Sequence, residues 1–173
     1  MNIYDQYIED LIPFAEDAIY EGDYHLAHKL LMSGLTDEPG YPKLHYTMGW
    51  MYHYYQVNEA LAERHYQLAI YFDASYVEAY ENLADLYWAK RKYQSLTQLM
   101  LKAEKCEEID KDYVYSVLGK IAETQCEYRK AIGYYRKALM SSVDNHTTKE
   151  LKQDIKRTRI KKFKNNWKWQ RQS

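Results

Sequence analysis

Apolar residues recur at spacings of three and four positions along most of this chain, with polar residues between them. That spacing is typical of helices that bury one face and expose the other. The periodic segments come in successive pairs, and short polar breaks separate them. With only six glycines and three prolines in 173 residues, the chain has few residues suited to long loops. The pattern therefore predicts helices joined by short turns.

The arrangement of residue types repeats with a period of about 35 residues, a length typical of a two-helix unit. Four copies in phase cover residues 8–41, 42–76, 77–111 and 112–146, after a lead-in at residues 1–7. Each copy places a small residue in its first helix, and most copies place a matching one in the second. The small residues are Ala15, Gly49, Ala84 and Gly119 in the first helices, and Ala27, Ala62 and Ala131 in the second. Small side chains allow close approach of two backbones, so we expect each pair of helices to cross at these positions.

The chain holds 20 tyrosines, and so many need a structural reason. Large residues beside the small ones would fill the space around each crossing, and we expect this packing to account for most of the tyrosines. Asp23 and Asn58 stand just before two of the second helices, where a side-chain oxygen can cap a helix N-terminus. The tyrosines predicted to lie in the core by their place in the repeat are Tyr52, Tyr66, Tyr87 and Tyr135.

These residues resemble the tetratricopeptide repeat family, whose unit has a large-small pair, a Tyr, a turn, an Ala, an aromatic residue, another Ala and often a Pro. The resemblance covers residues 8–146, with departures such as a closing proline that survives only at Pro39. Ala62 comes one residue late, which predicts a longer turn near Val57. The resemblance implies an all-α fold, a right-handed superhelix of stacked antiparallel helix pairs.

The segment after His146 predicts one further helix, which covers the last repeat. Leu151 and Ile155 lie one turn apart, as a helix that caps a repeat array requires. Past Thr158 the apolar stripe is lost. We therefore expect a capping helix at residues 147–160, which starts near Thr147, and a basic, flexible tail at residues 161–173.

In the tetratricopeptide family the first helices line a concave groove, and the resemblance implies which positions face it. Carried onto this sequence, those positions are mostly acidic and aromatic. In the fourth repeat they include Lys120 and Glu123. The residues chosen as the candidate peptide-binding groove are Glu16, Tyr20, Tyr46, Trp50, Tyr54, Glu78, Glu81, Asp85, Trp88 and Lys120.

The chemistry of these positions predicts the kind of ligand. The family's clamp for a C-terminal carboxylate needs cations and amides, yet here those places hold Glu16, Glu81 and Asp85. An acidic tail would be repelled, and a basic or aromatic extended peptide would be favoured, with Trp50 and Trp88 among its anchors. The alternative is that the aromatic residues serve packing and the acids form a solvated face.

A net charge of −1 hides a division along the chain. Residues 149–173 hold ten basic and two acidic residues, whereas residues 1–148 hold 14 basic and 23 acidic ones. The tail could bind nucleic acid, rest on an anionic membrane surface or dock on the acidic groove. It could also be a solvated helix end. The residues chosen for the basic tail are Arg157, Arg159, Lys161, Lys162, Lys164, Trp167 and Trp169.

Motifs for catalysis are missing from the sequence. It has no glycine-rich phosphate loop and no nucleophile or zinc-protease motif. His25 and His28 lack a third ligand for a metal, and Cys106 and Cys126 have no evident base beside them. We therefore expect no enzyme, no catalytic residue, no cofactor and no metal.

The leading hypothesis is a protein- or peptide-binding scaffold or chaperone-like adaptor. The alternative is a nucleic-acid-associated factor that acts through the basic tail. A mean hydropathy of −0.74 and the lack of a long apolar run predict no membrane-spanning helix, and the N-terminus does not resemble a signal peptide. Two cysteines that form neither a disulfide framework nor a metal-ligand spacing suggest a cytoplasmic location.

Overall fold

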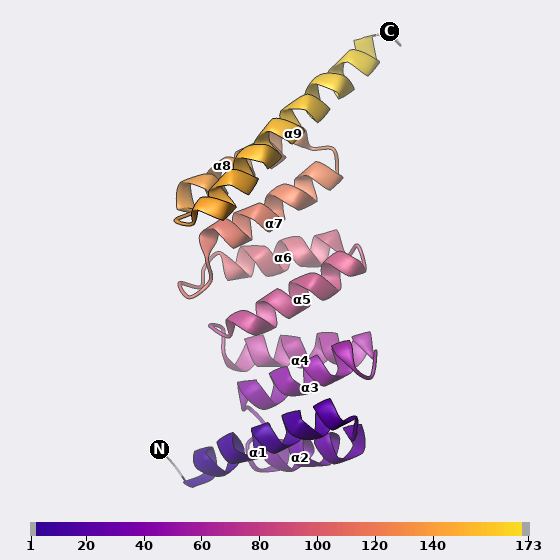
Figure 1. The fold of residues 1–173 in the computed structure, drawn as a ribbon, viewed down its shortest axis with the longest axis vertical. Helices are drawn as coiled ribbons and strands as arrows, with labels where there is room; N and C mark the ends of the chain where they lie inside the picture. The colour runs from indigo at the N-terminus through magenta and orange to yellow at the C-terminus, as the bar shows by residue number, and fades with distance from the viewer. Residues whose placement is uncertain (1–2, 171–173) are drawn as a thin grey trace. The chain divides into compact units, whose positions relative to one another are not determined.

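The computed structural model describes the backbone of residues 3–170 and the side chains of residues 6–165. Within that range every regular element is an α-helix, and no strand occurs. Over the same residues, none of the helices is both long enough and apolar enough to cross a bilayer. In chain order the helices are α1 (Ile3–Glu21), α2 (Tyr24–Asp37), α3 (Pro42–Tyr54), α4 (Glu59–Phe72), α5 (Val77–Ala89), α6 (Tyr93–Ala103), α7 (Lys111–Thr124), α8 (Tyr128–Ser141) and α9 (Asn145–Gln170) (Figure 1).

The chain divides into two compact units, Met1–Arg91 and Lys92–Ser173. In the first unit α1 packs on α2 and α3 packs on α4, while α3 also contacts α1 and α5. In the second unit α7 packs on α8, α6 contacts α7, and α9 covers α8. The boundary falls between α5 and α6, inside the third repeat. Each unit is thus a stack of antiparallel helices joined by short turns, as the hydrophobic pattern predicted.

The close crossings predicted from the small residues are present in both units. A Cβ atom added to Gly49 of α3 would lie 2.8 Å from the ring of Tyr66 in α4. A Cβ added to Gly119 of α7 would lie 2.6 Å from the ring of Tyr135 in α8. Real Cβ atoms do not approach other atoms so closely, so glycine is required for these rings to reach the neighbouring helix. The small residues also predicted at crossings, Ala15, Ala27, Ala62, Ala84 and Ala131, are all buried.

The tyrosines divide between the core and the surface. The four predicted core tyrosines are buried, as is Tyr80. However, the expectation that most tyrosines belong to the core is wrong for the described side chains, since no others are buried. Tyr20 and Tyr71 are 68% and 76% exposed. A tyrosine can pack its ring and keep its hydroxyl in water, so partial burial satisfies both ends of the side chain.

The predicted helix starts are confirmed by their capping contacts. The Asp23 carboxylate accepts a hydrogen bond from the backbone N–H of Leu26 at 2.9 Å, and the Asn58 side chain accepts one from Leu61 at 3.2 Å. The turn before Asn58 contains Val57 at a positive φ of 50°. Gly22, Arg91 and Cys126 also have positive φ, in the turns before α2, α6 and α8. The turn at residues 55–58 is longer than those three turns, as the late position of Ala62 predicted.

Helix α9 is longer than the sequence pattern predicted. It begins at Asn145 rather than Thr147, because the Asp144 carboxylate accepts a hydrogen bond from the backbone N–H of Thr147 at 2.7 Å. It continues past residue 160 to Gln170. No glycine or proline interrupts it, and its many lysines favour helix even where no apolar stripe remains. As predicted, Leu151 and Ile155 are buried in the core that covers α8.

A pair of histidines joins α3 to α4 inside the first unit. The Nδ1 atoms of His45 and His65 lie 3.2 Å apart, and His45 Nε2 lies 2.9 Å from the carbonyl oxygen of Pro39. A carbonyl can only accept, so His45 Nε2 carries a proton and donates it. In the neutral pair His45 Nδ1 is therefore the acceptor, and His65 Nδ1 is the donor.

The surroundings of this pair disfavour protonation. Burial lowers the pKa of His45 below its ordinary value. The pKa of His65 is lowered to about 4, first by burial and then by the neighbouring His45, Arg64 and His28. A proton added to His45 would occupy Nδ1 and remove the lone pair that accepts the hydrogen bond between the rings. The packing of α3 on α4 thus depends on neutral imidazoles.

Two glycine substitutions test the helix crossing. Gly119→Ala should destabilise the fold by about 1–3 kcal/mol, because the added Cβ overlaps the buried ring of Tyr135. Gly133→Ala, in α8, has nothing within 4 Å of its added Cβ and should stabilise by about 0.5–1 kcal/mol through helix propensity. Urea unfolding measures both. Equal effects of the two changes would show that the crossing at Gly119 is not tight.

Acidification should weaken the first unit through the histidine pair. A lowered folded-state pKa means that the unfolded chain binds protons more readily. The stability is therefore complete above the ordinary pKa of 6.5 and is lost as pH falls toward about 4. His65→Gln keeps a hydrogen-bond donor but cannot titrate, so it should flatten this dependence. Urea midpoints at about pH 8 and about pH 5 measure this loss of stability. His25→Gln is the control, because His25 is an exposed histidine of α2.

Candidate functional site

The predicted groove residues of the first unit come from α1, α3 and α5, which contact one another through α3. Most of them are exposed or half-buried, as a binding surface requires. We call this surface the first-helix face. Its residues are Glu16 and Tyr20 of α1, Tyr46, Trp50 and Tyr54 of α3, and Glu78, Glu81, Asp85 and Trp88 of α5.

An aromatic cluster joins α1 to α3 on this face. The ring of Tyr20 meets the ring of Trp50 edge to face, with centroids 5.5 Å apart. Tyr55, at the end of α3, lies 5.0 Å from Trp50 and 6.3 Å from Tyr20. Trp50 is half-buried, whereas Tyr20 is 68% exposed. Trp50 therefore helps to hold the two helices together, and Tyr20 presents aromatic surface to solvent.

A hydrogen-bonded bridge joins α3 to α5. The hydroxyl of Tyr54 donates to Asn82 Oδ1 at 2.9 Å, and Asn82 Nδ2 donates to the hydroxyl of Tyr46 at 3.3 Å. Asn82 Nδ2 also lies 2.9 Å from the carbonyl oxygen of Glu78, one turn earlier. Sequence reasoning missed Asn82, because only the packing of α3 on α5 brings it between two tyrosines. One amide thus fixes the positions of two aromatic side chains on this face.

Acidic residues from two helices converge on these tyrosines. Burial raises the pKa of Tyr46, and the charges of Glu78 and Glu16 raise it further. Burial also raises the pKa of Tyr54, with Asp85 adding to it. Carboxylates of α1 and α5 therefore add negative potential at the hydroxyls of α3, which stay protonated at neutral pH. The first-helix face combines negative potential with partly exposed aromatic rings.

The predicted groove residues of the fourth repeat lie in the second unit, and they differ in environment. Lys120 is exposed on α7. Glu123, expected to face a ligand, is only 8% exposed and is bound within the chain. It accepts hydrogen bonds from Tyr135 Oη at 2.8 Å, Arg157 Nη2 at 2.6 Å and Arg157 Nε at 3.0 Å. Lys161 Nζ lies 2.9 Å from Glu123 Oε1, the oxygen that also accepts from Arg157 Nε. The expected role of Glu123 in the groove is wrong, because α9 supplies its partners.

This cluster determines the protonation of Glu123. Burial alone would raise its pKa, but the hydrogen bonds from Arg157, Lys161 and Tyr135 outweigh burial and lower the pKa to about 2. Arg157 also pairs with Asp154 of its own helix. Two of the residues predicted to form a basic tail are therefore anchored to α7.

The remaining basic residues of α9 lie on different sides of the helix. Arg157 and Lys161 are four residues apart and share the side that meets Glu123. Arg159, Lys162 and Phe163 line a pocket of about 510 Å³ together with α8. Lys164 is exposed, and Trp167 and Trp169 lie outside the residues whose side chains the structure describes. The predicted tail is thus a helix whose charges have separate surroundings.

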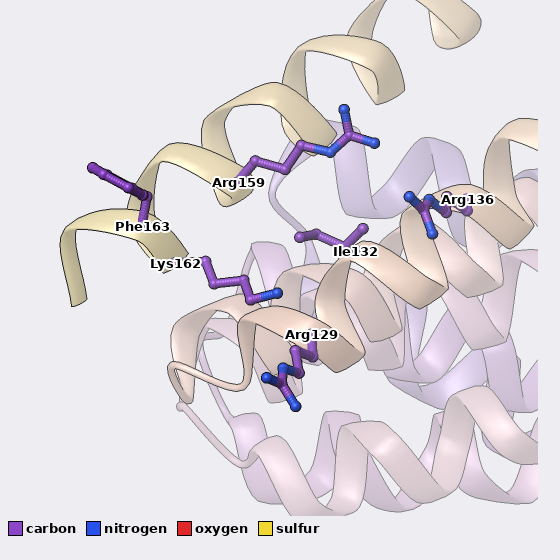
Figure 2. Close-up of a pocket in the computed structure, with 6 residues that line it drawn as sticks. All are labelled: Arg129, Ile132, Arg136, Arg159, Lys162 and Phe163. Carbon is purple, nitrogen blue, oxygen red and sulfur yellow. The ribbon is translucent and has the colours of Figure 1, made fainter. Parts of the chain in front are cut away.

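The pocket between α8 and α9 is lined mainly by cations, and we call it the basic cleft. Figure 2 shows Arg129, Ile132 and Arg136 on α8 opposite Arg159 and Lys162 on α9, with the Phe163 ring directed outward. Among the described side chains, none of the four cations forms an ion pair or hydrogen bond with the chain. A neighbouring pocket continues along the helix ends and shares two of these cations. It is lined by Cys126, Glu127, Tyr128, Arg129, Lys130, Lys162 and Asn165.

Sequence reasoning missed the contribution of α8 to this cleft. Arg129 and Arg136 are seven residues apart, which places both on one side of a helix. The division of charge therefore begins earlier than residue 149. Residues 128–170 hold 13 basic and three acidic residues, a net charge of +10, whereas residues 1–127 hold ten basic and 22 acidic residues, a net charge of −12.

Sequence comparison with known proteins gives a partial match. No family model matches the chain. Over 73 residues it is 36% identical to the "Uncharacterized protein ycf37" of Cyanophora paradoxa, a match that covers 40% of this chain and 42% of that protein. The chain thus spans less than half the length of this relative.

Solved structures resemble the chain over a larger share of its length. Pseudomonas aeruginosa pilF superimposes with a TM-score of 0.71 at 16% identity, covering 94% of this chain and 72% of that one. The MamA protein superimposes with a TM-score of 0.61 at 17% identity, covering 92% of this chain and 93% of that one. The Arabidopsis OM64 TPR domain superimposes with a TM-score of 0.55 at 23% identity, covering 69% of this chain and 94% of that domain. The chain therefore has the tetratricopeptide fold that its sequence predicted.

Loss of the Glu123 charge should loosen α9. Glu123→Gln removes the carboxylate that binds Arg157 and Lys161, and should cost about 2 kcal/mol of stability. Hydrogen exchange should speed up in α9 more than in α7. Glu150→Gln is a matched control, because it removes an exposed carboxylate of α9. Glu150 Oε2 lies 3.9 Å from His146 Nδ1 of the same helix and contacts neither Arg157 nor Lys161. Unchanged exchange in α9 would show that the cluster does not anchor it.

Proposed function

We propose that this protein is a non-enzymatic scaffold or chaperone-like adaptor of the cytoplasm that binds a protein or peptide segment on its first-helix face. The tetratricopeptide fold is that of a protein-interaction scaffold. The observation that carries the proposal is the convergence of acids from α1 and α5 on the partly exposed tyrosines of α3. Aromatic surface surrounded by charge is typical of protein-binding sites.

The chemistry of this face favours an extended peptide with basic and aromatic or proline residues. Lysine or arginine side chains of a ligand would pair with Glu78, Glu81 and Asp85 and would be steered to the face by its negative potential. An apolar ligand residue would pack against Tyr54 and Trp88, which are 51% and 39% exposed. The Asn82 bridge fixes part of this surface before a ligand arrives, which reduces the entropy lost on binding.

An acidic C-terminal tail does not suit the same face. A carboxylate ligand needs cations or amide donors at its contact points. Glu16 and Glu78 stand near Tyr46, and Asp85 stands near Tyr54, so an anion would meet negative charge at both ends of the α3 surface. This electrostatic mismatch argues against a carboxylate clamp.

The alternative function, nucleic-acid binding through the tail, has less support. Arg157 and Lys161 are paired with Glu123, which neutralises part of the positive charge on that side of α9. Residues 1–127 also carry a net charge of −12, which opposes a long phosphate backbone.

Charge reversal on α5 tests the proposal. Glu81→Lys/Asp85→Lys should weaken the binding of a peptide that contains Lys, Arg, Trp and Pro by at least about tenfold, because it replaces attraction with repulsion. Asp37→Lys/Glu107→Lys changes the net charge equally at exposed positions outside the face. Isothermal titration calorimetry with the same peptide measures both variants. Equal weakening by the two variants, or none by either, would contradict a role for this face.

A further inference from the structure

We propose that the basic cleft between α8 and α9 is a second binding site, which takes an acidic peptide segment of a partner protein. The site lies in the second unit and is separate from the first-helix face. It is made of Arg129, Ile132 and Arg136 of α8 and Arg159, Lys162 and Phe163 of α9. The proposal therefore stands or falls independently of the function proposed above.

The cleft presents cations that the fold itself does not use. α8 contains four basic residues and no acidic one. Within the described side chains, Arg129, Arg136, Arg159 and Lys162 have no carboxylate partner. Like charges gathered on one surface repel one another, and a ligand that supplies negative charge would relieve that repulsion. Three of the four cations are arginines, whose planar guanidinium binds a carboxylate through two parallel hydrogen bonds.

The walls of the cleft are held in place by other contacts. On one side of α9, Arg157 and Lys161 bind Glu123 of α7. On its packed side, Leu151 and Ile155 are buried in the core with α8. These contacts hold α9 in position. Arg159 and Lys162, which line the cleft, take no part in them. A site built on two fixed helices loses little entropy when a ligand binds.

The apolar residues of the cleft favour a peptide over a simple anion. Ile132 lies between Arg129 and Arg136 on α8, and Phe163 is 71% exposed at the edge (Figure 2). Ile132 is only 8% exposed, so the exposed ring of Phe163 is the apolar surface that a ligand can reach. A segment that alternates acidic and aliphatic residues would place carboxylates on the arginines and an aliphatic side chain against this ring. The pocket volume of about 510 Å³ is enough for a few side chains.

The row of charge continues along α9 beyond the cleft. Lys152, Lys156 and Arg159 are separated by four and three residues, so they lie along one side of the helix. Lys152 and Lys156 are both exposed. An acidic segment longer than the pocket would therefore find further partners along α9.

Nucleic acid fits the same cleft less well. Single-stranded nucleic acid is bound by successive aromatic rings on which bases stack, whereas the residues that line this cleft include a single aromatic ring, that of Phe163.

Fluorescence anisotropy on the full chain tests the proposal. The probe is a labelled peptide of alternating Glu and Leu, compared with its Gln analogue and with a uridine oligonucleotide of equal charge. Arg129→Glu/Arg136→Glu should weaken binding of the Glu peptide by at least about tenfold. Lys102→Glu/Lys105→Glu makes the same change of charge at exposed positions of the second unit that do not line the cleft and should change binding of the Glu peptide by less than about twofold.

The outcomes separate the possible explanations. Selective loss with the α8 variant, together with weak binding of the Gln peptide, supports the site. Equal loss with both variants would show general charge attraction and would overturn it, as would tighter binding of the oligonucleotide than of the peptide. Circular dichroism checks that the variants fold. Arg129→Ala/Arg136→Ala serves as a second pair, with a smaller loss expected, should the glutamates disturb α8.

Discussion

The close approach of paired helices, at a small residue of one and a tyrosine of the other, is the contact on which both units depend. Gly49 admits the ring of Tyr66, and Gly119 admits the ring of Tyr135. In each case the tyrosine hydroxyl reaches a residue one turn after the glycine, His53 in the second repeat at 3.3 Å and Glu123 in the fourth at 2.8 Å. The repeat therefore supplies a buried ring with a polar end, and the residue that meets that end differs between copies.

That difference explains why equivalent positions in the two units have different roles. In the second repeat the neighbouring residues remain part of an aromatic surface, since Tyr54 and His53 lie with ring centroids 4.2 Å apart. In the fourth repeat a carboxylate stands at the equivalent place, and α9 lies close enough to neutralise it with Arg157 and Lys161. A position that faces a ligand in a repeat array becomes, beside a capping helix, part of the fold. The cap thus removes one acidic residue from the surface available to a partner.

Helix α9 shows how packing partitions charge. Its basic residues look like one tail in the sequence, yet the buried stripe of Leu151, Ile155 and Thr158 separates them into two groups. One group binds Glu123, and the other faces the cations of α8 across the basic cleft (Figure 2). The protein consequently carries an acidic aromatic surface in its first unit and a basic cleft in its second.

Sequence alone determined the helices, the period, the crossings at Gly49 and Gly119 and the caps at Asp23 and Asn58, because these follow from local spacing and side-chain size. It also assigned the residues of the first-helix face to the first helices of their repeats, where the structure has them. Only the tertiary structure decided that Asn82 bridges two tyrosines, that Glu123 is bound by α9, and that α8 supplies half of the basic cleft. These facts depend on which sides of distant helices meet, and side-chain periodicity within one helix does not contain that information.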